Sequence, residues 1–157
     1  LLNERVGSTA AISTVAIVAL GTGMGIGRWY GGLVLKNLKL DTQLLSVIAM
    51  QFLGFLGFWL SHNMFVSLLC LFAVGLGISM QFALSSIRLI GLSDGRPDLA
   101  IGRASLAAGT AIAGAPFLLG ILGDKFGISR GYIMVFVLIA IAFVIVKTIP
   151  SKVHEAA

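Results

Sequence analysis

Charged residues are scarce in this chain. Asp, Glu, Lys and Arg make up 11% of its 157 residues, whereas soluble domains average about a quarter. Hydrophobic residues make up 58%, and the mean hydropathy is +1.04. A soluble fold of this size could not bury so much apolar surface, so the composition favours a protein embedded in a membrane.

Cysteine and acidic residues are nearly absent from the apolar part of the sequence. The single cysteine, Cys70, cannot form an internal disulfide or a cysteine-rich metal site. No acidic residue lies well inside an apolar segment, and no residue spacing is typical of a metal site, a phosphate-binding loop or a nucleophile with its base. We therefore expect no enzyme activity, no metal and no cofactor.

The basic residues are too dispersed to form a nucleic-acid surface. Lys and Arg number 11 against 6 for Asp and Glu, which gives a net charge of +5. They stand singly between apolar segments and form neither a stripe nor a cluster. We expect a lipid bilayer as the surroundings of this chain, and no nucleic acid.

Five apolar segments fill almost all of the chain. They cover residues 8–35, 44–60, 64–90, 101–122 and 132–149. Each is close to the roughly 20 residues with which a helix crosses a bilayer, and none alternates with the period of two that marks a barrel strand. The sequence predicts an all-α integral membrane protein with five transmembrane helices in a single membrane domain, residues 1–157.

Turns and prolines divide these segments. The short polar turn at residues 61–63 leaves room only for an antiparallel hairpin between the second and third segments. Pro97, in the polar stretch 93–98, prevents one continuous helix from the third segment into the fourth. Pro116 lacks a backbone N–H inside the fourth segment, which predicts a kink there.

Loop charge predicts the orientation, because Lys and Arg near span ends accumulate on the cytoplasmic side. If the segments alternate in direction, one side of the membrane holds eight basic residues and the other three. The first side has Arg28, Lys36, Lys39, Arg88, Arg96, Arg103, Lys147 and Lys152, and the second has Arg5, Lys125 and Arg130. We expect a cytoplasmic C-terminus in a bacterial inner membrane, and an outward start that suggests a further span before Leu1.

A polar stripe in the third segment is the best candidate for a solute pathway. Gln81, Ser85 and Arg88 follow i, i+4, i+7 spacing and so share a helix face. Because polar groups facing lipid are costly, this face should look into the bundle or a watery cavity. It could line a pathway or only hold helices together through hydrogen bonds. Thr14 and Thr110 are weaker candidates, since threonine often bonds its own helix backbone.

A second candidate site lies at the end of the first segment. Its residues are Gly27, Arg28, Gly31 and Gly32, where glycines permit a tight turn or a close helix approach. We hypothesise that Arg28 pairs with Asp94 or Asp98 in one conformation and releases it in another. An arginine that only extends its side chain to the interface is the alternative.

The fourth and fifth segments differ in their expected surroundings. Gly109 and Gly114, with alanines between them, permit close helix crossing, and Pro116 adds a kink that suits a rocking helix. By contrast, residues 133–146 carry no polar side chain. We expect that segment at the periphery, facing lipid.

These motifs resemble the C-terminal half of a major facilitator superfamily transporter. The stretch 27–32, Gly-Arg-Trp-Tyr-Gly-Gly, is similar to the second copy of that family's cytoplasmic loop motif. Residues 109–120, with Gly114-Ala115-Pro116, resemble its eleventh helix, and residues 120–127 resemble the turn into its twelfth. The resemblance implies that the five segments are helices eight to twelve of a half-bundle of six.

The resemblance also implies a function. Such a chain would be a fragment of a secondary transporter that moves a small solute by alternating access, with the missing N-terminal half of the same polypeptide as its partner. Helices two to six of the other half are a second assignment, although the short tail after Pro150 argues against it. From a different class, a membrane subunit or scaffold that transports nothing is the alternative.

Overall fold

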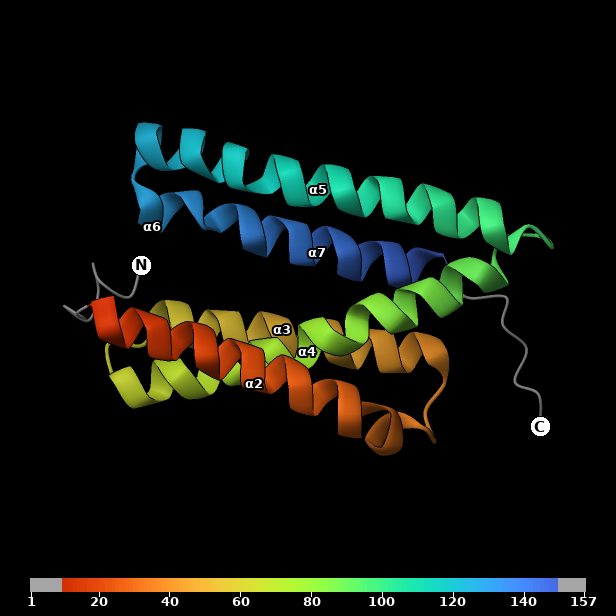
Figure 1. Ribbon diagram of the computed structural model, residues 1–157, viewed down its shortest axis with the longest axis horizontal. Helices are drawn as coiled ribbons and strands as arrows, with labels where there is room; N and C mark the ends of the chain where they lie inside the picture. Colours follow the sequence, from red (N-terminus) through yellow and green to blue (C-terminus); the bar gives the residue numbers. More distant parts are fainter. Residues whose placement is uncertain (1–9, 150–157) are drawn as a thin grey trace. The chain divides into compact units, whose positions relative to one another are not determined.

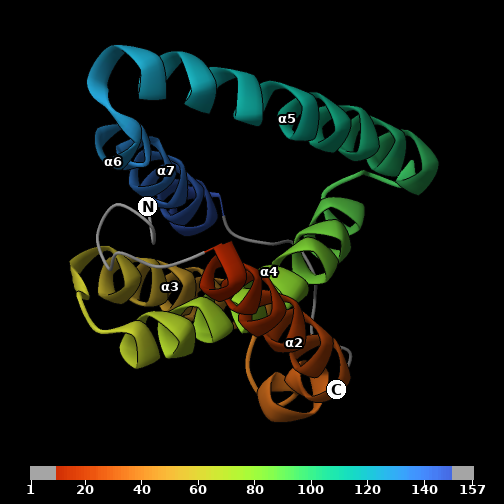
Figure 2. The same ribbon diagram turned by 60° about the vertical axis from the view of Figure 1, so that its left-hand side comes forward.

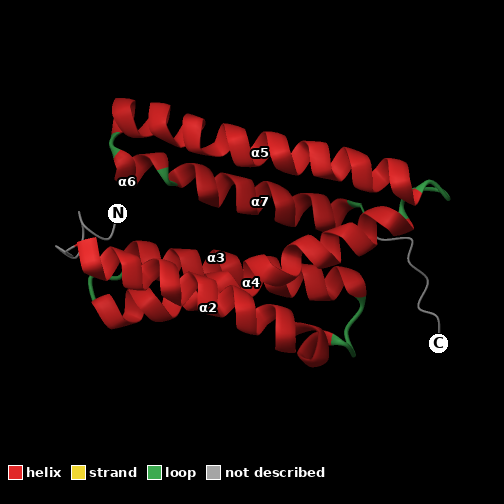
Figure 3. Ribbon diagram, viewed as in Figure 1, coloured by secondary structure: helices red, strands yellow, loops and turns green. Residues whose placement is uncertain are grey.

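The computed structural model describes the backbone of residues 10–149 and the side chains of residues 14–149. Every element in this part of the chain is a helix, so the predicted all-α class is confirmed (Figure 3). In chain order the helices are α2 (Ala10–Leu35), α3 (Leu40–Leu60), α4 (Met64–Gly91), α5 (Pro97–Phe126), α6 (Ile128–Gly131) and α7 (Ile133–Thr148), as labelled in Figure 1.

Four stretches of helix are long and apolar enough to cross a bilayer, which needs roughly 20 residues. They are α3, α4, α5 and the pair α6 and α7, which together cover Ile128–Thr148. Helix α2 has 26 residues and covers most of the first predicted span, whose first two residues, Ser8 and Thr9, lie outside the described part. These four stretches suggest a membrane protein, and the count of five spans also requires α2 to cross.

Helix α5 extends beyond the predicted segment 101–122 at both ends. It begins at Pro97, because a proline at the first helical position gives up an N–H that has no partner there anyway. The glycines at 120 and 123 do not end it. The helix stops instead at Gly127, whose φ of +84° is a left-handed conformation that suits glycine.

The link between α3 and α4 is as short as the sequence predicts. The backbone N–H of Phe65 donates to Asn63 Oδ1 over 2.9 Å, so Asn63 caps the start of α4. The Ser61 hydroxyl donates to the Asn63 carbonyl over 3.0 Å. This compact turn sends α4 back along α3 as an antiparallel hairpin (Figure 1).

The described residues fall into two compact units, one ending at Leu84 and the other beginning at Ser85, within α4. In the first unit, α2, α3 and most of α4 form a three-helix bundle. Its most buried hydrophobic side chains, Leu44, Val47 and Ile48, all come from α3 and are each 2% exposed. Helix α3 is therefore the central element of this bundle.

The second unit contains the end of α4 followed by α5, α6 and α7. Gly127 turns the chain into α6, which lies beside the end of α5 (Figure 2). Gly131 is buried there, and a Cβ on it would lie 3.3 Å from the backbone nitrogen of Gly123. No residue of α5 is buried, although the helix is apolar along most of its length. Helix α5 thus offers its whole length to lipid or to further helices.

Candidate functional site

Glycines line the contact between α2 and α4 in the first unit. Gly23, Gly27 and Gly31 of α2 and Gly75 of α4 are all buried, and we call these four residues the glycine seam. A Cβ on Gly27 would lie 2.8 Å from the Leu76 carbonyl oxygen, closer than real Cβ atoms come. The four-residue spacing on α2 is the small-residue pattern that lets membrane helices touch through their backbones.

The seam changes the interpretation of stretch 27–32. These residues are helical and α2 continues to Leu35, so the stretch forms no turn, and Gly27 and Gly31 serve helix contact. Arg28 and Gly32 lie on the exposed side of the same helix. The proposed partners of Arg28, two aspartates, belong to the other unit, and the ion pair stays a prediction.

Glycines also bring α3 and α4 together. A Cβ on Gly57 would lie 2.7 Å from Cys70 Sγ, and one on Gly54 would lie 2.9 Å from a methyl carbon of Val74. On α4, a Cβ on Gly77 would lie 2.5 Å from Cγ of Gln51. The small size of Gly77 therefore makes the space in which the Gln51 side chain runs.

A hydrogen bond between two glutamines crosses this contact. Gln51 is 5% exposed, and its Nε2 donates to Oε1 of Gln81 over 2.6 Å. From the sequence, Gln51 stands alone among apolar residues and is expected to make a single hydrogen bond that only packs helices together. Gln81 is expected to line the solute pathway. The bond joins the two residues and gives the side-chain carbonyl of Gln81 a packing role, which is the alternative considered for the polar stripe.

We expect the two glutamines to be energetically coupled. A double-mutant cycle of Gln51→Leu and Gln81→Leu should give a coupling energy of about 0.6–1.7 kcal/mol, the usual range for such bonds between membrane helices. Unfolding can be followed by the fluorescence of Trp29 and Trp59, the chain's two tryptophans, which both lie in this unit.

The control for this cycle combines Gln51→Leu with Ser46→Ala. The Ser46 hydroxyl donates to the Thr42 carbonyl of its own helix, so these two changes should be additive. Additivity of the glutamine pair itself would show that the 2.6 Å bond contributes nothing to stability.

The remaining pathway candidates have different surroundings. Ser85 is exposed on α4, and Thr14 is exposed on α2. Thr110 is exposed on α5, and its hydroxyl donates to the Leu106 carbonyl over 2.8 Å, the bond to its own helix that threonines commonly make. Thr14 belongs to the first unit and the other two residues belong to the second, and a pathway role for each stays a prediction.

Arg88 has a defined place in the second unit. It is 8% exposed, and its Nη2 donates to the carbonyl oxygens of Val146, over 3.3 Å, and Ile149. It belongs to the last turn of α4 and bonds the last turn of α7. A cation at this place satisfies carbonyls that have no partner within their own helix and complements the negative ends of two helix dipoles.

This contact places the ends of α4 and α7 at one end of the second unit. Arg88 and Lys147 therefore lie at the same end, as does the start of α5, which follows α4 after a short loop. Lys125 and Arg130 belong to the opposite end, where α5 passes into α6. Within this unit, the basic residues therefore divide between the two ends as expected for segments that alternate in direction. The compartment that each end faces stays a prediction.

The other predicted residues lie along α5 and the loop before it. Asp94 is exposed with φ +48°, a left-handed conformation, and Asp98 is exposed in the first turn of α5. A Cβ on Gly109 or on Gly114 would have no neighbour within 4 Å among the described residues. The helix continues through Pro116. The close crossing predicted for this helix therefore has no partner at its glycines within the described part.

A cavity of about 190 Å³ lies between α2, α3 and α4. Its walls include Gly27, Val47 and Met80, and Ser46 is the one lining residue with a polar side chain. That hydroxyl already bonds its own helix. The cavity offers a solute no charged group and no amide, and within residues 10–149 no group of three or more His, Cys, Asp or Glu could hold a metal.

Three features were not predicted from the sequence: the seam positions Gly23 and Gly75, the Gln51–Gln81 bond, and the bonds from Arg88 to α7. The four-residue spacing from Gly23 to Gly31 was a signal that could have revealed the first. Comparisons with protein-family models, with curated proteins and with solved structures gave no match.

Proposed function

We propose that this chain is part of a secondary transporter that moves a small solute across a bacterial inner membrane by alternating access. The observation that carries the proposal is α5, a 30-residue apolar helix, rich in Gly and Ala, with no buried residue. Small residues at Gly109 and Gly114 suit close packing against further helices, and Pro116 suits bending. In the proposal, those helices come from the N-terminal half of the same polypeptide.

The resemblance to the major facilitator superfamily supports the same proposal. The stretch 27–32, which resembles the family's loop motif but is helical here, precedes the Gly-Pro helix and the turn at residues 120–127. This is the order that helices eight to twelve require. Transport then depends on two halves that rock around a site near the middle of the membrane. The coding sequence upstream of Leu1 should accordingly hold roughly seven further apolar spans.

Cysteine labelling tests alternating access before the solute is known. Cys70 is the only cysteine among these 157 residues, so Cys70→Ala, together with replacement of any cysteine in the rest of the polypeptide, gives a thiol-free background. We expect Ser85→Cys and Thr110→Cys in the full-length protein to react with a membrane-impermeant maleimide in both right-side-out and inside-out vesicles. Their rates should exceed that of Ala140→Cys, on apolar α7, by roughly tenfold or more, because a thiol in hydrocarbon rarely ionises.

Access from both faces is the decisive result, since a static protein without an open pore exposes a given thiol to one face at most. The alternative is a membrane subunit or scaffold that transports nothing, and the Gln51–Gln81 bond favours it because that bond uses a candidate pathway group for packing. In that case Ser85→Cys and Thr110→Cys would react from one face only, or as slowly as Ala140→Cys.

A further inference from the structure

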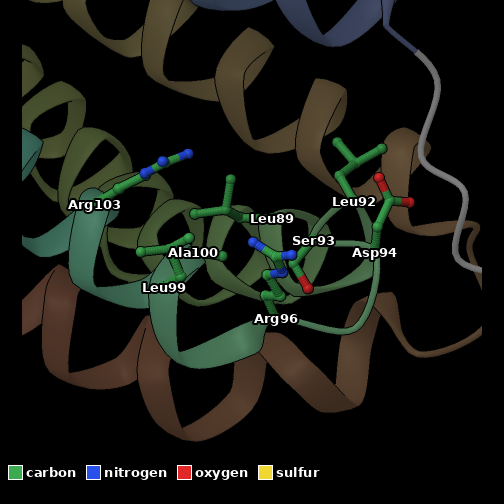
Figure 4. Close-up of a pocket in the computed structure, with 8 residues that line it drawn as sticks. All are labelled: Leu89, Leu92, Ser93, Asp94, Arg96, Leu99, Ala100 and Arg103. Atoms are coloured by element: carbon green, nitrogen blue, oxygen red, sulfur yellow. The ribbon is translucent and has the colours of Figure 1, made fainter.

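A cavity in the second unit lies where α4 passes into α5. It has a volume of about 530 Å³ and is walled by the end of α4, the loop and the first two turns of α5 (Figure 4). Two arginines line it, Arg96 and Arg103, with Asp94 as the one acidic group. In Figure 4, Arg96 lies between the other two charged side chains, with Arg103 on the opposite side from Asp94.

Both guanidinium groups are available for a ligand. Arg96 and Arg103 are exposed, and among the described residues neither guanidinium has a hydrogen-bond or ion-pair partner. Arg96 is the last residue before α5 and Arg103 lies in the second turn of that helix, and both side chains line the cavity. Guanidinium groups bind phosphate with paired, charge-assisted hydrogen bonds.

Apart from the three charged residues and Ser93, whose hydroxyl donates to the Ile90 carbonyl, the cavity is lined by apolar side chains. Leu89, Leu92, Leu99 and Ala100 supply side chains without polar atoms. A free inorganic anion would gain nothing from such a wall. A ligand with a phosphate joined to a hydrocarbon chain would use both parts of the lining.

The length of α5 sets the depth of this cavity in a bilayer. Residues 104–123 form an uncharged stretch of 20 residues, which at 1.5 Å per residue spans about 30 Å, the thickness of the hydrocarbon core. Arg103 is the last charged residue before this stretch. The cavity therefore lies beside the hydrocarbon boundary, at the level of the lipid phosphates.

We propose that this cavity binds the phosphate of an anionic phospholipid, with Arg96 and Arg103 as ligands and the leucines beside its glycerol and upper acyl chain. The inference concerns the lipid that surrounds the chain and does not depend on transport. It rests on the cavity, the two available guanidinium groups, the apolar wall and the depth of α5.

Lipid titration of the full chain in detergent micelles tests the proposal, with native mass spectrometry to count bound lipids. Wild type should retain phosphatidylglycerol in preference to phosphatidylcholine. The double variant Arg96→Gln/Arg103→Gln should lose about 25-fold in that preference, because each basic residue near an anionic surface contributes about fivefold. Both side chains are exposed, so we expect the variant to fold normally.

The matched control is Lys125→Gln/Arg130→Gln, which removes the same charge from the opposite end of the same unit. Its lipid preference should stay near that of wild type. The variant Arg96→Lys/Arg103→Lys should lose less of the preference for phosphatidylglycerol than Arg96→Gln/Arg103→Gln does. If Arg96→Gln/Arg103→Gln and Lys125→Gln/Arg130→Gln lost the same amount of lipid preference, general charge attraction would explain the binding and the proposal would be overturned. Displacement of the lipid by inorganic phosphate as effectively as by phosphatidylglycerol would also overturn it, because the apolar wall would then have no role.

Discussion

Replacing Gly23 with alanine should lower the free energy of unfolding by about 1–3 kcal/mol, the usual cost of adding a group to a tightly packed contact. The new Cβ would meet the backbone oxygen of Phe72 and would lie 3.2 Å from the backbone nitrogen of Leu76. Backbone atoms cannot rotate away as the tip of a side chain can. Helices α2 and α4 would have to separate, and the rest of the glycine seam would lose its close contact.

Gly25 provides a matched control two residues along the same helix. It is exposed, and a Cβ on it would have no neighbour within 4 Å. Gly25→Ala should therefore be neutral or stabilise by up to about 1 kcal/mol through helix propensity. The measurement is detergent-driven unfolding followed by the fluorescence of Trp29 and Trp59. If the two variants unfolded at the same midpoint, the seam would have no role in stability.

Replacing Arg88 with alanine should destabilise the last turn of α7. The change removes two hydrogen bonds from a charged donor, each worth about 1.5–3 kcal/mol, and leaves two carbonyls without that donor. We expect faster hydrogen exchange at the amides of the last turn, including Ile149, whose N–H donates to the Ile145 carbonyl over 3.1 Å. Arg88→Lys keeps the charge and should show a smaller increase.

Lys147→Ala is the control for this experiment. Lys147 lies in the same last turn of α7 and carries the same charge, but it is exposed. Its loss should change the exchange rates little. Equal acceleration by both variants would assign the effect to charge at the helix end and not to the two bonds from Arg88.

The sequence predicted the helices better than their contacts. Hydrophobic runs and the turn at 61–63 were enough to place α3 and α4 as a hairpin, because an apolar segment in a bilayer must satisfy its own backbone. The turn fixes the direction of α4 but not its offset along α3. That offset decides whether Gln51 lies beside Gln81, so their bond could not be read from spacing.

Glycine patterns had the same limit. Small residues permit close helix approach but do not select a partner. On α2 the four-residue pattern contacts α4 through Gly23, Gly27 and Gly31. On α5, a Cβ on Gly109 or Gly114 would have no neighbour within 4 Å in the described part of the chain. Glycines occur in both helices, and the sequence does not tell which of them contact a neighbouring helix. Only the arrangement of the helices decides this.

The tight link through Gly127 has a consequence for how the second unit enters a membrane during synthesis. Leu, Ile, Phe and Val each favour insertion by about 0.3–0.6 kcal/mol, and 11 of the 16 residues of α7 are of these four types. Helix α5 is richer in Gly and Ala and gains less by itself. Gly127 joins α5 to the segment containing α7 with almost no loop. We therefore expect the two helices to insert as a pair, because the favourable insertion free energy of α7 adds to the smaller one of α5.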